Sequence, residues 1–382
     1  MGINANVPGL SRVTSRQVPV GHSDRPVTSA RADLVTSGFG VWLIVGLFTD
    51  GWAHMNLPGL ETFFTPWHAL LYSGFAASAA WITVLVLRNV RKGWQRSRAL
   101  PVGYRLAAVG VVVFGAGGVA DMAWHVLFGV EVGVDALLSP THLVLLTGGV
   151  LVLTAALRSG WARPVDTAGP TLRSELPAVV SLGLVTALVG FFLLYVSVFE
   201  QPAAAVPFVR IPEGAPGHQA SEQPVALGLA GYLVTTVLLV VPVLLAERVG
   251  RRPRGLIVIV VGMVAWLSAA VNDLSTYGVV AATLVTVGAV IAELVGAVLQ
   301  RAPLPTGARL AALGAVIPLL LWTAQLAAVA ATAGLGWSPA LWSGAVVLST
   351  LVGAMLGLST GWAPTRMAGP GETTRPERPS ER

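Results

Sequence analysis

Two segments of the chain carry the same order of acidic and histidine residues. The first reads D-G-W-A-H from Asp50 and continues to T-P-W-H-A-L-L-Y-S-G; the second reads D-M-A-W-H from Asp121 and continues to S-P-T-H-L-V-L-L-T-G. Each has an aspartate, a histidine four residues later, a further acid, Ser/Thr-Pro-x-His, and a glycine six residues after that histidine. Only the connecting loop differs, by three residues, and four of the six histidines of the chain lie here. The match indicates an internal repeat with a period near 71–74 residues.

The repeated side chains are the types that bind divalent metal ions. An aspartate and a histidine four residues apart share one helix face. Ser/Thr-Pro is typical of an N-cap followed by proline at the first helical position, which places the second histidine in the first turn of a returning helix. A tight hairpin then brings one carboxylate and two imidazoles to one point. The predicted metal ligands are Asp50, His54, His68, Asp121, His125 and His142.

Two imidazoles and a carboxylate without a thiolate suit copper, zinc or iron. Three protein ligands leave a coordination position open, as catalytic metal sites require. The pattern identifies no catalytic residue, and it leaves open whether the hairpins form two separate sites or one shared site. Glu61 and Glu131 also match between the copies and are candidates for second-layer ligands or proton carriers, with solvated loop acids as the alternative. The alternative for a single histidine at a helix end is a structural hydrogen bond.

The elements that must position these ligands are apolar helices. Of 382 residues, 54% are apolar and 11% charged, whereas a soluble domain carries roughly 25% charge. Stretches of about 20 apolar residues can cross a bilayer. The sequence therefore predicts an all-α, polytopic integral membrane bundle of about ten transmembrane helices. They are expected at 34–54, 66–88, 103–125, 140–158, 177–199, 224–246, 255–273, 277–299, 307–331 and 338–360.

The distribution of basic residues predicts the orientation. Arginine clusters occupy alternate loops and both tails, while the remaining loops hold only Arg210. This alternation favours cytoplasmic N- and C-termini in the inner (plasma) membrane, with the metal motifs near the extracytoplasmic face. Because the clusters are short topology signals, the pI of about 10.4 does not indicate a nucleic-acid partner. The expected surroundings are the lipid bilayer. The chain has no cysteine, which excludes disulfides and thiolate ligands.

The pattern divides the chain into four parts. Residues 1–33 and 363–382 are rich in Pro, Arg and small polar residues and are expected to be disordered cytoplasmic tails. Residues 34–160 form the predicted four-helix core with both motifs, and 161–362 form six further helices. Asp50, Asp121, Glu200 and Asp273 are each expected at the outer end of an odd-numbered helix.

Two further residues are of interest outside the repeat. Glu293 is expected inside a helix, where an ionisable group is a functional hypothesis and for which the sequence names no partner. His218 is expected in an outer loop after Glu200, as in a decayed third copy that lacks the histidine four residues after the acid.

At these motifs the sequence resembles the C subunit of copper membrane monooxygenases, the particulate methane and ammonia monooxygenases. F-T-P-W-H-A-L-L-Y-S-G, ending at Gly74, is similar to the helix start of that family, and the resemblance spans Val35 to Arg158. It implies that Asp50, His54 and His68 match one copper site. Asp121 and its two histidines match a second, where the family has an amide in place of the acid.

The resemblance implies a copper-binding membrane protein that uses O₂ to hydroxylate a small apolar molecule. Such a protein requires an electron source and partner membrane subunits or a homo-oligomer. Two alternatives remain open: a transporter whose Asp/His sets lie on an ion or proton path, and a haem-binding membrane protein with histidine axial ligands. The sequence does not indicate the substrate or the electron donor.

Overall fold

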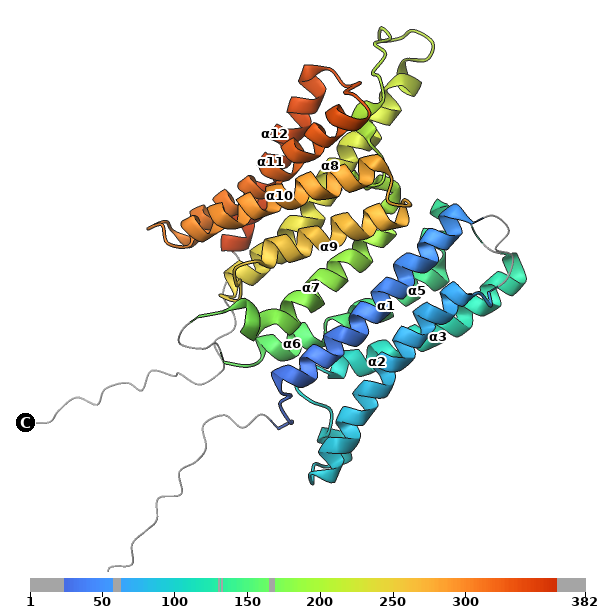
Figure 1. Cartoon of the computed structure of the whole chain (residues 1–382), viewed down its shortest axis with the longest axis vertical. Helices are drawn as coiled ribbons and strands as arrows, with labels where there is room; N and C mark the ends of the chain where they lie inside the picture. Colours follow the sequence, from blue (N-terminus) through green and yellow to red (C-terminus); the bar gives the residue numbers. More distant parts are fainter. Residues whose placement is uncertain (1–23, 58–62, 130, 132, 165–168, 363–382) are drawn as a thin grey trace, which may run out of the picture.

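The structure, a computed structural model, describes residues 24–57, 63–129, 131, 133–164 and 169–362, and within them all regular structure is helical (Figure 1). Nine helical spans in this part are long and apolar enough to cross a membrane. They are α1 (Ala30–Asn56), α2 (Pro66–Arg91), α3 (Arg105–Phe128), α5 with α6 (Pro140–Leu153 and Ala155–Trp161), α7 (Leu172–Phe192), α8 (His218–Arg248), α10 (Thr276–Leu299), α11 (Thr306–Thr332) and α12 (Pro339–Trp362). The remaining elements are short: η1 (Arg96–Arg98), α4 (Val134–Leu138), η2 (Leu194–Val196), η3 (Ala203–Ala205) and α9 (Leu256–Val271).

These elements confirm the predicted all-helical membrane bundle, and the chain is a multi-pass membrane protein. Each of the ten expected stretches overlaps an apolar helix, but α9 has 16 residues and is shorter than the other nine spans. Helix α1 begins at Ala30, four residues before the expected start at 34, because Ser29 caps it and accepts a hydrogen bond from the Ala32 N–H.

The fifth expected helix, 177–199, differs most from the structure. A capping box between Thr171 and Ser174 starts α7 earlier, at Leu172, and the helix ends at Phe192. The prediction that Glu200 lies at a helix end is therefore wrong, because Glu200 falls in the connection between η2 and η3. Helix α8 also begins earlier than expected, at His218, so that this histidine belongs to a helix and not to a loop.

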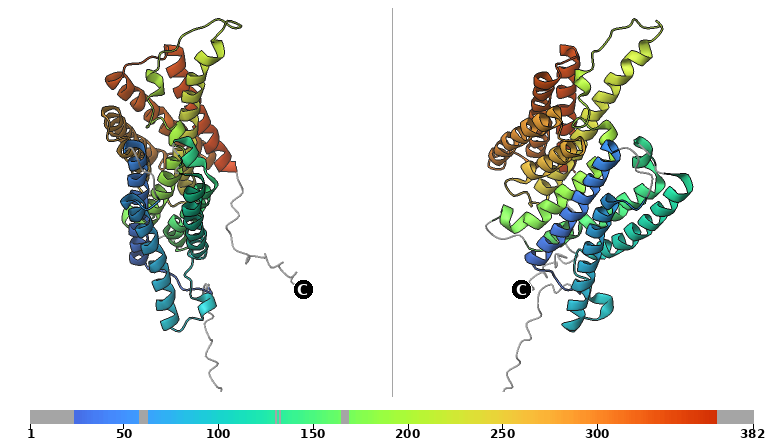
Figure 2. Two further views of the ribbon diagram at one scale, coloured as in Figure 1. Left: turned by 90° about the vertical axis from the view of Figure 1, so that its right-hand side faces the viewer. Right: turned by 45° about the vertical axis from the view of Figure 1, so that its right-hand side comes forward.

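The helices form two hairpins and a larger group joined by α7. The α1–α2 hairpin and the α3–α5 hairpin lie side by side, and α7 packs against α1 and α5 on one side and against α9 on the other (Figure 1). Helices α8, α10, α11 and α12 pack beyond α9, and Figure 2 shows the same order from two further directions. Helix α7 therefore connects the motif-bearing hairpins to the rest of the bundle.

The connections alternate between two ends of the bundle. The C-terminal ends of α2, α6, α8 and α10 lie along the lower and left side of the bundle in Figure 1, where the described arginine clusters lie; we name this the basic end. The C-terminal ends of α1, α3, α7, α9 and α11 lie along the upper and right side of the bundle. We name this the motif end, because Asp50 and Asp121 lie near the C-terminal ends of α1 and α3.

Glu293 has a partner that the sequence could not name. The Glu293 Oε1 atom lies 2.8 Å from the Arg252 guanidinium, and Oε2 accepts a hydrogen bond of 3.0 Å from the Ile257 N–H. The N-cap of α9 is Gly255, which has no side chain to cap the helix. The carboxylate of Glu293 thus satisfies an N–H at the start of α9, which gives this buried acid a structural role.

Candidate metal centre

The first hairpin places its three ligands by local chemistry. Asp50 and His54 lie one turn apart near the end of α1. Thr65 caps α2 with its hydroxyl, which accepts a 3.1 Å hydrogen bond from the His68 N–H, and Pro66 occupies the first helical turn. The N-cap and first-turn positions predicted from Ser/Thr-Pro are therefore those observed. In the second hairpin Ser139 caps α5 in the same way.

The glycine of each repeat lies where the two helices of a hairpin are closest. A Cβ atom on Gly74 would lie 2.7 Å from the Leu43 Cα, and one on Gly148 would lie 2.5 Å from the Phe114 backbone nitrogen. No side chain fits at those distances, so glycine permits the close crossing. Since each glycine follows its histidine by six residues, the tight crossing holds the first turn of the returning helix beside the end of the preceding one.

In the first set, both imidazoles approach one carboxylate. The His68 Nε2 atom lies 3.5 Å from Asp50 Oδ2, and the His54 Nε2 atom lies 3.9 Å from the same oxygen. One ligand atom from each side chain lies within 4.8 Å of the other two. Asp50 and His68 are buried and His54 is partly exposed. The set has the size and donor types of a metal site with three protein ligands.

The second set repeats this arrangement around Asp121. The His142 Nε2 atom lies 3.2 Å from Asp121 Oδ1, and the His125 Nε2 atom lies 3.6 Å from Asp121 Oδ2. These ligand atoms also lie within 4.8 Å of one another. The Thr141 hydroxyl donates a 2.8 Å hydrogen bond to Asp121 Oδ1 and fixes the carboxylate, which is 1% exposed.

Hydrogen bonds of the outer ring nitrogens favour metal-binding tautomers. The His142 Nδ1 atom contacts the Ala136 carbonyl, and His125 Nδ1 lies 3.3 Å from the Gly129 carbonyl and 3.4 Å from Glu131 Oε2. These carbonyl and carboxylate oxygens accept, so each Nδ1 carries a proton, and Nε2 is the ring nitrogen that faces Asp121 and would bind a metal ion. Metal-binding histidines characteristically donate their second N–H to a carbonyl or carboxylate in this way.

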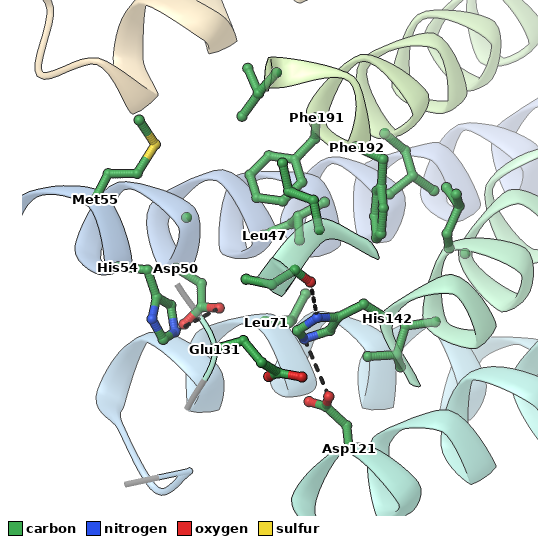
Figure 3. A pocket seen from close by; sticks show the side chains of 18 of the residues that line it. Leu47, Asp50, His54, Met55, Leu71, Asp121, Glu131, His142, Phe191 and Phe192 are labelled. Atoms are coloured by element: carbon green, nitrogen blue, oxygen red, sulfur yellow. Dashed lines mark hydrogen bonds and ion pairs between the residues drawn. The ribbon is translucent and has the colours of Figure 1, made fainter. Parts of the chain in front are cut away.

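Both sets face one cavity of about 320 Å³ between the two hairpins and α7. The His68 and His125 ring centroids, one from each set, are 6.3 Å apart. Figure 3 shows His54 beside Asp50, and His142 between Asp121 and the α7 residue Phe192. The rest of the lining is largely apolar and includes Leu43, Ile44, Leu47, Leu71, Phe114, Leu145, Leu188, Phe191 and Phe192. The two sets are therefore neighbours in a single apolar chamber, which we call the motif cavity.

The charges in the motif cavity favour bound cations. Four carboxyl side chains line it, and no lysine or arginine does so in the described part of the chain. The Asp50 Oδ1 atom is buried and has no hydrogen-bond partner among the described residues. Buried charges are normally paired or coordinate metals. The lining carboxyl groups are Asp50, Asp121, Glu131 and Glu200.

The other predicted residues have different positions. Glu131 lies beside His125 in the motif cavity, as a second-layer residue would. Glu61 lies outside the described residues. Asp273 accepts a 3.2 Å hydrogen bond from the Trp52 indole, and the His218 Nδ1 atom lies 2.7 Å from the Ile211 carbonyl. Neither of these last two residues lines the cavity.

Four polar residues of the cavity were not predicted to lie in it: Tyr72, Tyr195, Glu200 and Gln201. Tyr72 lines the cavity, and its hydroxyl is buried without a hydrogen-bond partner in the described chain. Tyr72 lies four residues after His68, so both side chains lie on one helix face. This spacing predicts that Tyr72 faces the same site as His68. Glu200 was identified as an acid at a helix end and not as a cavity residue. No spacing rule connects it to the hairpins, because its position depends on how α7 packs.

Comparisons with protein-family models, with curated proteins and with solved structures find no match for this chain.

Proposed function

We propose that this chain is a copper-binding membrane protein that holds two copper ions side by side and uses O₂ to hydroxylate a small apolar molecule. The observation that carries the proposal is the convergence of two complete Asp/His/His sets on one apolar cavity. Two divalent cations would offset its four carboxylates. The first ion would be held by Asp50, His54 and His68, and the second by Asp121, His125 and His142.

Copper fits the donors better than the harder divalent cations do. Imidazole nitrogens suit copper, zinc and iron, whereas magnesium and calcium require oxygen ligands. The resemblance to the C subunit of copper membrane monooxygenases favours copper within that group. Bound copper would supply the one-electron and O₂ chemistry that a side chain alone lacks.

The apolar cavity walls would bind the substrate and exclude water. Aliphatic and aromatic side chains, among them Leu47, Leu71 and Phe191, surround the ligand sets and would bind a small apolar substrate. Exposed apolar side chains also cover the outward faces of the two hairpins, such as Val112 and Val119 on α3, which are 71% and 66% exposed. Because these faces would contact lipid, an apolar substrate would arrive from the bilayer.

The geometry argues against a haem site. In each set both imidazole Nε2 atoms lie within 3.9 Å of one carboxylate. Axial haem ligands must instead approach the iron from opposite faces of a planar ring. The absorption spectrum of the purified protein separates the two cases, since haem gives a Soret band and copper(II) gives a weak d–d band.

Oxygenase activity is tested with copper-loaded protein in lipid vesicles, supplied with a one-electron reductant, O₂ and a short-chain alkane. We expect formation of the corresponding alcohol, measured by gas chromatography, and its loss in the His142→Ala variant. Two bound copper ions without any alcohol would contradict the oxygenase assignment. Copper-free protein that moves protons or ions across the vesicle membrane would favour the transporter alternative.

The orientation is tested by thiol labelling, which has no background because the chain lacks cysteine. We propose that the motif end faces outward and the basic end faces the cytoplasm. Cysteine at exposed Asp135, at the motif end, should react with an impermeant thiol reagent in intact cells. Cysteine at exposed Ser97, at the basic end, should react only after lysis. The reverse pattern would contradict the orientation.

A further inference from the structure

Glu200 is the carboxyl side chain of the motif cavity that does not come from the two hairpins. It lies in the connection between α7 and α8 and lines the same cavity as the six proposed ligands. Its Oε2 atom is shielded from solvent and has no hydrogen-bond partner in the part of the chain that the structure describes. The residue as a whole is only partly buried, and the next residue, Gln201, is exposed. Because Gln201 lines the cavity too, Glu200 lies on the part of the cavity wall that reaches the exposed surface at the motif end.

Glu200 has no cation beside it, unlike the fully buried acids at the basic end. Each of the buried acids at the basic end lies within 3.0 Å of an arginine. These acids are Asp33, Glu175, Glu247 and Glu293. The other three cavity acids each lie beside a histidine, whereas no ion pair is found for Glu200 among the described residues. An uncompensated carboxyl group in apolar surroundings favours its protonated form.

The electrostatic surroundings of Glu200 also favour its protonated form. Burial raises the pKa of Glu200 to about 7, so that the group can gain or lose a proton near neutral pH. From α10 it faces Tyr277, and across the cavity it faces the carboxylates and imidazoles of the two ligand sets. The positive charge of bound metal would favour the carboxylate, and a decrease in that charge would favour the acid.

Side chains on or next to α9, α10 and α11 hold the segment that carries Glu200 by hydrogen bonds to its backbone. The Val198 carbonyl accepts a 2.5 Å hydrogen bond from the Tyr277 hydroxyl and one of 3.4 Å from the Gln325 amide. The Asn272 amide donates a 3.3 Å hydrogen bond to the Glu200 carbonyl. These donors belong to α10, α11 and the end of α9, so this region of the chain determines where the carboxyl group lies.

We propose that Glu200 is the proton-exchanging group of the motif cavity: it takes up one proton from the solvent at the motif end when the copper pair gains one electron. This inference rests on the proposed function. Two copper(II) ions would balance the four carboxylates, and one electron from a one-electron donor would leave one negative charge in excess. An unbalanced charge is costly in a low-dielectric cavity. Conversion of the Glu200 carboxylate and a solvent proton to the carboxylic acid restores neutrality.

The test measures proton uptake on reduction of the copper-loaded full chain in detergent. The protein is held in weak buffer with a pH indicator and titrated with hexaammineruthenium(II), a one-electron donor without a titrating proton. We expect uptake of about one proton with the first electron in the wild type. Glu200→Gln should lose most of that uptake while it retains its copper. Asp273→Asn, a change of another acid at the motif end that does not line the cavity, should leave the uptake unchanged.

The outcomes separate this inference from the function on which it rests. Undiminished proton uptake in copper-loaded Glu200→Gln would overturn the inference and leave the copper site standing. Loss of copper in that variant would also overturn it, because Glu200 would then act in metal binding. A wild type that binds no copper would overturn both. Infrared difference spectra supply an independent readout: the carboxylic acid band that appears on reduction should be missing in Glu200→Gln.

Discussion

Replacement of His68 with alanine is expected to remove one of two copper equivalents from the purified protein while the chain stays folded and inserted. His68 is buried, and its Nε2 atom lies 3.5 Å from Asp50 Oδ2. Loss of its imidazole leaves two protein ligands at that site. Since removal of second-layer groups already lowers metal affinity by about 10–100-fold, loss of a direct ligand should exceed that. His54→Ala should have the same effect, and metal analysis by mass spectrometry measures it.

The same experiment has two informative comparisons. Asp50→Asn should be milder, because an amide oxygen can still bind the ion. His218→Ala is a matched control, since the His218 ring contacts the Ile211 carbonyl and does not line the motif cavity. This control should keep both copper ions. If His68→Ala and His218→Ala lower stability equally and leave the metal content unchanged, His68 is a structural histidine and the metal assignment is wrong.

Two copper ions bound to the two ligand sets are expected to be magnetically coupled. Because the His68 and His125 rings are 6.3 Å apart and line one cavity, two copper(II) ions held by the two sets would interact magnetically. Electron paramagnetic resonance of the fully loaded protein should show a coupled pair, with a half-field transition or a signal well below two spins per chain.

Selective removal of one site provides the control for this coupling. His142→Ala should yield one copper per chain with an ordinary uncoupled spectrum, because only the set around Asp50 remains complete. Two uncoupled signals in the loaded wild type would contradict the shared cavity. A single copper per wild-type chain would instead indicate that the two sets hold one ion between them.

The local arrangement of each ligand set could be predicted from the sequence because it depends on short-range rules. Asp50 and His54 share a face through helical periodicity, and Thr65-Pro66 starts the returning helix through capping chemistry. The hairpin connection then brings His68 to the same point. The repeated glycine can be recognised in the sequence. Only the structure shows why a glycine is needed there, namely the close crossing of the two helices at Gly74.

The shared cavity could not be predicted, because it depends on contacts between segments far apart in the chain. Glu200 follows Asp121 by 79 residues and reaches the cavity only because α7 packs against α1 and α5. The partner of Glu293, Arg252, lies 41 residues away in the connection between α8 and α9. The start of the fifth helix could not be predicted from hydropathy alone. A capping box at Thr171 starts α7 at Leu172, before the apolar window of 177–199 begins.

The copper content of the wild-type chain, purified from cells grown with copper and measured together with protein concentration, tests the central claim most directly. The two Asp/His/His sets in one cavity predict two copper ions per chain, with one lost in each of His68→Ala and His142→Ala. A wild type without stoichiometric metal, together with histidine variants that are only less stable, would contradict the claim and favour a transporter.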